Sequence, residues 1–160
     1  MTTRPPADAI VALRSLGRRW RGLFAGLDED ESPDALARRP GDQGRAALDH
    51  AAHATATLRL LDRALEQILV DEGATLDAAV TDPGQRSWPT PGSGVEEAID
   101  DLAAQAERIA DRADRAAPAD WSRRAGGVDA LTVLWDAVDS AVADLRAAEA
   151  TLHEVRGRSS

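Results

Sequence analysis

Two of the three histidines stand one helical turn apart, His50 and His53, in the stretch "GRAALDHAAHA" (residues 44–54). Imidazoles at this spacing project from one side of a helix, and two of them can bind a single divalent cation. Helical bundles are a common setting for such sites, because their ligands project inward from facing helices. The alternative is a pair of partly buried histidines that bond to main-chain or carboxylate oxygens without metal.

Two carboxylates have a similar spacing further along the chain. Asp136 and Asp139 lie one turn apart in "DAVDSAV" and are candidates for an acid and base pair, although exposed aspartates on a helix edge are far commoner. Asp139 is the better candidate. If it lies in a helical core beside His53, the two side chains are expected to form a charge-assisted hydrogen bond without any metal.

The elements that must position these residues are helices. Four stretches place apolar residues every three or four positions, and proline and glycine gather between them. They run from about Asp8 to Leu27, from about Arg45 to Glu72, from Gly94 to Pro118, and from Gly127 to about Val155. Alternating strand patterns are missing, and the chain has only five aromatic residues. The sequence therefore predicts an all-α four-helix bundle, with residues 1–155 as a single domain and residues 156–160 as a frayed tail.

The connections carry further expectations. Residues 74–93 are long for a bundle connection, which usually takes about 2 to 8 residues, and this length permits a crossover between the second and third helices. The stretch "SPDALARR" (residues 32–39) predicts a short extra helix after the first long one. Trp88 and Trp121 fall in connections, where they either cover the core or line a ligand pocket.

Composition excludes several classes of function. The formal net charge is −9, which disfavours nucleic acid as a partner, and no cysteine is present to supply a disulfide or a thiolate. No apolar run approaches the roughly 20 residues that span a membrane, so we expect a cytoplasmic protein with no membrane partner. The cluster Arg14, Arg18, Arg19 and Arg21 is interpreted as a solvated helix face paired with acidic neighbours.

Three segments of the chain together resemble a known family: "ALRSLGRRWRGLFAGLDED", "RRPGDQGRAALDHAAHATATLRLLDRAL" and "PADWSRRAGGVDALTVLWDAVDSAVADL". In their order and spacing they resemble the DinB-like superfamily, in particular its mycothiol-dependent maleylpyruvate isomerase-like branch. The resemblance implies a DinB-like four-helix bundle with a long crossover. It also implies a divalent metal held by one histidine of the second helix and two histidines four apart on the fourth, and a homodimer.

The chain departs from that ligand pattern. His53 matches the histidine of the second helix, but Asp139 and Ala143 stand where the resemblance places the two histidines of the fourth. An alanine cannot bind metal, so the remaining candidate ligands are His53, His50 and Asp139, for zinc or nickel. Two functions follow as hypotheses. The favoured one is a noncatalytic bundle with a degenerate metal site that binds a small ligand or forms a homodimeric interaction module, and the alternative is a metal- and thiol-dependent transferase or isomerase.

Overall fold

The chain forms four long helices that pack as an all-α bundle. The computed structural model describes residues 4–25, 44–90 and 94–157. The helices are α1 (Pro6–Ala25), α3 (Ala47–Val70), α4 (Val95–Arg115) and α5 (Ala130–Gly157). These bounds confirm the four predicted helical stretches, and α5 continues two residues past Val155. The short helix expected over residues 32–39 lies outside the described residues.

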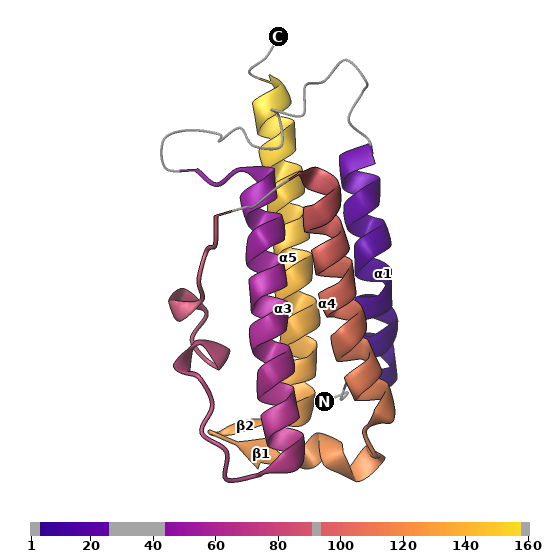
Figure 1. Ribbon diagram of the computed structural model, residues 1–160, viewed down its shortest axis with the longest axis vertical. Coiled ribbons are helices and arrows are strands. Elements are labelled where there is room, and N and C mark those ends of the chain that lie inside the picture. The colour runs from indigo at the N-terminus through magenta and orange to yellow at the C-terminus, as the bar shows by residue number, and fades with distance from the viewer. Residues whose placement is uncertain (1–3, 26–43, 91–93, 158–160) are drawn as a thin grey trace.

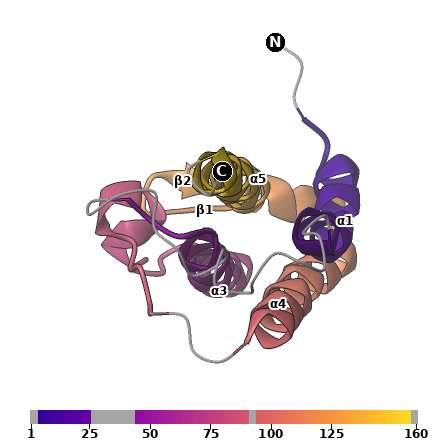
Figure 2. The same ribbon diagram turned by 90° about the horizontal axis from the view of Figure 1, so that it is seen from above.

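The four helices form a ring in which α3 and α1 each pack against both α4 and α5 (Figure 2). Figure 1 shows that α1 and α5 run in one direction along the bundle and that α3 and α4 run in the other. Because α3 and α4 are parallel, the chain between them must return along the whole length of the bundle. Residues 71–90 therefore belong to the crossover that the long connection permitted.

This crossover is anchored at Arg86. It contains two short 3₁₀ helices, η1 (Ala78–Val80) and η2 (Pro83–Gln85), which lie beside α3. The buried guanidinium of Arg86 donates hydrogen bonds to the main-chain oxygens of Ala79 and Val80, and to Asp136 on α5 at 2.8 Å. A single side chain thus orders the segment and attaches it to the bundle.

Between α4 and α5 the chain forms η3 (Pro118–Ser122) and a two-residue hairpin of β1 (Arg124–Ala125) and β2 (Val128–Asp129), which the sequence reading did not predict. Gly126 and Gly127 form its turn with φ angles of 58° and 81°. Two consecutive positive φ angles favour glycine at both positions, so the dipeptide "GG" is the feature of the sequence that could have predicted this turn.

Leucine, isoleucine and tryptophan side chains from all four helices fill the centre of the bundle. The largest fully buried ones are Trp20, Leu13, Leu16, Leu58, Leu61, Leu65, Ile68, Leu102, Ile109, Leu134 and Leu152. Where α1 meets α4, a Cβ at Gly17 would lie 2.8 Å from the Cβ of Ala103, so glycine permits the close approach of these two helices. Within the described part of the chain, no helix combines the length and apolar character needed to cross a membrane.

The outer face of α1 carries the predicted arginine cluster. Arg14 forms ion pairs with Glu107, Asp111 and Asp114 on α4, and Arg21 pairs with Asp100 at 2.8 Å. These contacts confirm the pairing with acidic neighbours for Arg14 and Arg21. Arg18 and Arg19 lie on the same exposed face of the helix.

Candidate functional site

His50 and His53 converge on one carboxylate, that of Asp144. Their three-residue spacing places both imidazoles on the side of α3 that faces α5. Nδ1 of His53 lies 2.8 Å from one carboxylate oxygen of Asp144, and Nδ1 of His50 lies 3.3 Å from the other. The Asp144 side chain is 8 % exposed, and the two imidazoles are 13 and 14 % exposed. These three residues form a nearly buried group that we call the His–Asp–His cluster.

The chemistry of the cluster follows from which atoms can donate. An ionised carboxylate only accepts hydrogen bonds, so each imidazole must carry its proton on Nδ1 to bond with Asp144. In a neutral imidazole this leaves Nε2 with a free lone pair, available as a proton acceptor or a metal ligand. No hydrogen bond from Nε2 of either ring occurs within the described ranges.

Trp88 of the crossover covers both imidazoles. Its ring stacks on His53 with centroids 3.8 Å apart and planes 15° apart, and it meets His50 edge-on at 5.3 Å. The guanidinium of Arg45 lies 4.5 Å from the centroid of the same indole. The crossover therefore positions Trp88 as a lid over the His–Asp–His cluster. The other connection tryptophan, Trp121, is partly buried against the core.

Asp139 is not part of this cluster, and the condition for its bond with His53, a position in the helical core, is not met. Its side chain is 56 % exposed and accepts two hydrogen bonds from Arg4, at 2.9 and 3.0 Å. Five residues separate Asp139 from Asp144, which is a rotation of about 140° around α5, so the two carboxylates face different directions. The candidate set of His50, His53 and Asp139 is therefore not brought together. The residues that the structure describes contain no group of three or more His, Cys, Asp or Glu side chains arranged to hold a metal ion.

Asp136 and Asp139, the candidate acid and base pair, each bind a different arginine. Asp136 accepts from Arg86 and from the hydroxyl of Ser140, whereas Asp139 binds Arg4. Arg4 also stacks on Trp135 with its guanidinium carbon 3.6 Å from the ring centroid. Each carboxylate thus has its own cationic partner.

Asp144 was not predicted from the sequence as a residue of the candidate site. Buried positions recur along α5 at intervals of three and four residues: Ala130, Leu134, Ala137, Ala141, Asp144, Ala148, Thr151 and Val155. Asp144 stands inside this stripe, where an acidic residue needs a buried partner. The same spacing was present in the sequence and was the signal that would have found it.

No protein-family model matches the chain, and neither a curated protein nor a solved structure is found to be similar to it.

Proposed function

We propose that the protein is a noncatalytic DinB-like bundle whose metal site is degenerate and which binds a small ligand. The observation that carries the proposal is the Asp144 carboxylate, which accepts from Nδ1 of both His50 and His53. A carboxylate in this position supplies the histidines with a hydrogen-bond partner from the protein itself. The polar atoms of the cluster therefore satisfy one another by hydrogen bonding, and the cluster needs no metal ion to be stable in a nearly buried position.

A metal ion would be short of ligands at this position. A catalytic zinc usually takes three protein ligands and keeps one open position. Among the candidate ligands in the described part of the chain, the Nε2 atoms of the two imidazoles remain available, because both oxygens of Asp144 contact Nδ1 atoms and Asp139 is bound to Arg4. We therefore expect zinc and nickel to bind too weakly to stabilise the folded state measurably.

Thermal melting with added metal tests this proposal. A cation that binds only the folded state raises the melting temperature, because it contributes RT ln(1 + [L]/Kd) to stability. We expect no change in melting temperature with zinc, nickel or manganese, in wild type and in His53→Ala alike. A rise in wild type that is lost in His53→Ala but kept in His153→Ala, whose residue is exposed near the end of α5, would contradict the proposal.

A second candidate function is a metal- and thiol-dependent transferase or isomerase, and one observation favours it. Metal-binding histidines generally donate their second ring nitrogen to a carboxylate, and the contacts of Asp144 have this form. Under this alternative, purified protein carries about one metal per chain and converts an electrophilic substrate in the presence of mycothiol. The homodimer that the same resemblance implies is testable by analytical ultracentrifugation.

A further inference from the structure

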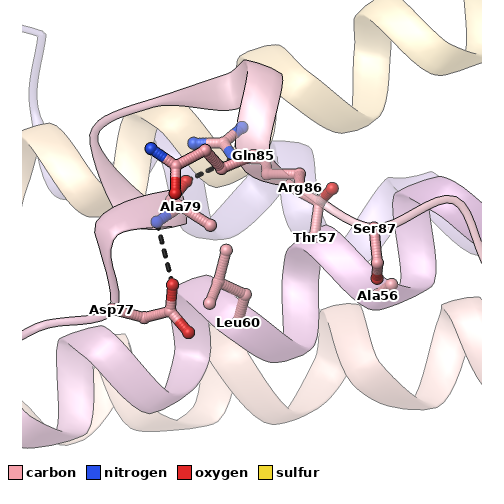
Figure 3. Close-up of a pocket in the computed structure, with 8 residues that line it drawn as sticks. All are labelled: Ala56, Thr57, Leu60, Asp77, Ala79, Gln85, Arg86 and Ser87. Carbon is pink, nitrogen blue, oxygen red and sulfur yellow. Dashed lines mark hydrogen bonds between the residues drawn. The ribbon is translucent and has the colours of Figure 1, made fainter.

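A small cavity lies between α3 and the crossover, one turn along α3 from His53. Its volume is about 170 Å³. Ala56, Thr57 and Leu60 line it from α3, and Asp77, Ala79 and Gln85 line it from the crossover (Figure 3). Pockets for drug-sized molecules usually measure about 300 to 1,000 Å³, so any ligand of this cavity must be smaller than those.

The hydroxyl of Thr57 is a buried polar group that has no partner among the residues the structure describes. Thr57 is 2 % exposed, and its Oγ1 makes no hydrogen bond within the described part of the chain. Figure 3 shows this hydroxyl directed from α3 toward the crossover. Thr55, two residues earlier on the same helix, instead donates to the main-chain oxygen of Ala51 at 3.1 Å. Buried hydroxyls are nearly always paired, so the unpaired one at Thr57 marks a place where a bound molecule would supply a partner.

The charges around the cavity favour a cation over an anion. Arg86 also lines it, but its guanidinium is already bonded to Asp136, Ser140 and two main-chain oxygens. Asp77 uses one carboxylate oxygen to accept from the main-chain nitrogen of Ala79 at 2.9 Å, and its other oxygen has no partner among the described residues. The arginine is therefore neutralised by Asp136, and the carboxylate of Asp77 is left to attract positive charge.

From these observations we propose that the cavity between α3 and the crossover binds a small hydroxylated amine. The Thr57 hydroxyl bonds the hydroxyl of the ligand, the free oxygen of Asp77 accepts from its ammonium group, and Leu60 packs against its short carbon chain. This inference rests on the proposed ligand-binding function and assigns it a place and a chemical class.

The first test uses ethanolamine as the probe, with ethylene glycol and glycolate as matched molecules that are neutral and anionic. Each is titrated into the millimolar range against the full chain, and amide shifts are followed by two-dimensional NMR, because ligands with few atoms bind weakly. We expect saturable shifts at the lining residues, strongest for ethanolamine and weakest for glycolate. Shifts equally strong with glycolate, or no shifts at these residues because the cavity holds only water, would overturn the proposal.

The second test compares variants of two threonines of α3 that are two residues apart. Thr57→Val keeps the shape of the side chain and removes only the unpaired hydroxyl, so we expect it to fold at least as stably as wild type and to bind ethanolamine about tenfold more weakly. Thr55→Val, the control, loses a hydroxyl that is already bonded inside α3 and is expected to bind ethanolamine as wild type does. Equal affinity in Thr57→Val and Thr55→Val would refute the role of Thr57.

A third variant keeps the proposal testable if Thr57→Val does not fold. Asp77→Asn retains an oxygen that accepts from Ala79 and removes only the negative charge. It should weaken ethanolamine binding while leaving ethylene glycol binding unchanged, and an equal effect on both probes would contradict the charge assignment. Metal titration tests the His–Asp–His cluster, and ethanolamine titration tests the cavity. Failure of ethanolamine to bind would therefore reject this inference but would not be evidence that the cluster binds a metal.

Discussion

The carboxylate of Asp144 on α5 lies 2.8 Å from Nδ1 of His53 on α3, in a position that excludes most solvent. The same carboxylate bonds His50, so one acidic residue satisfies two imidazoles and joins the two helices that pack most extensively. The His–Asp–His cluster therefore helps to hold the bundle together in addition to being a candidate site. Replacing Asp144, the hydrogen-bond acceptor, tests this structural role.

Replacing Asp144 with alanine should cost stability. The substitution leaves two nearly buried imidazoles without an acceptor. Each unsatisfied group carries a penalty of about 1 to 3 kcal/mol, so we expect a loss of roughly 2 to 6 kcal/mol in the free energy of unfolding. Asp139→Ala is the matched control on the same helix, because its ion pair with Arg4 is exposed to solvent and is expected to contribute little to stability. Urea denaturation measures both, and equal losses would show that Asp144 has no special role.

Removing the indole of Trp88 should uncover the histidines. Trp88 stacks directly on His53 and touches His50 edge-on, so Trp88→Ala is expected to increase the rate at which diethylpyrocarbonate modifies both imidazoles. Trp121→Ala removes a tryptophan from another connection and should leave that rate unchanged. The modified histidines are identified by mass spectrometry, and an unchanged rate in Trp88→Ala would mean that the indole does not shield them.

A second buried carboxylate, Asp62 on α3, depends on Arg112 of α4. The guanidinium nitrogen lies 2.7 Å from the carboxylate, and this hydrogen bond raises the pKa of Arg112. Arg112→Met leaves the negative charge of Asp62 unpaired, for which we expect a loss of about 3 to 5 kcal/mol in the free energy of unfolding. The double variant Asp62→Leu with Arg112→Met should recover much of that loss, and no recovery would show that the damage comes from packing alone.

The fold was largely predictable because apolar spacing determines which stretches become helices that share a core. The closeness of His50 and His53 also follows from helical geometry. Asp139 was chosen as the candidate on α5 because that choice relied on resemblance, whereas the buried stripe of α5 contains Asp144. Neither the stacking of Trp88 on His53 nor the cavity at Thr57 was predictable, since both depend on the path of a long irregular crossover.

The most direct test of the central claim is nitrogen-15 NMR of the imidazole rings, recorded before and after one equivalent of zinc is added to protein that carries no histidine tag. We predict that Nδ1 of both His50 and His53 carries a proton, bonded to Asp144, and that zinc leaves the ring nitrogen signals unchanged. Zinc-dependent shifts of both Nε2 signals at one equivalent would contradict the degenerate site and would favour the metal-dependent enzyme.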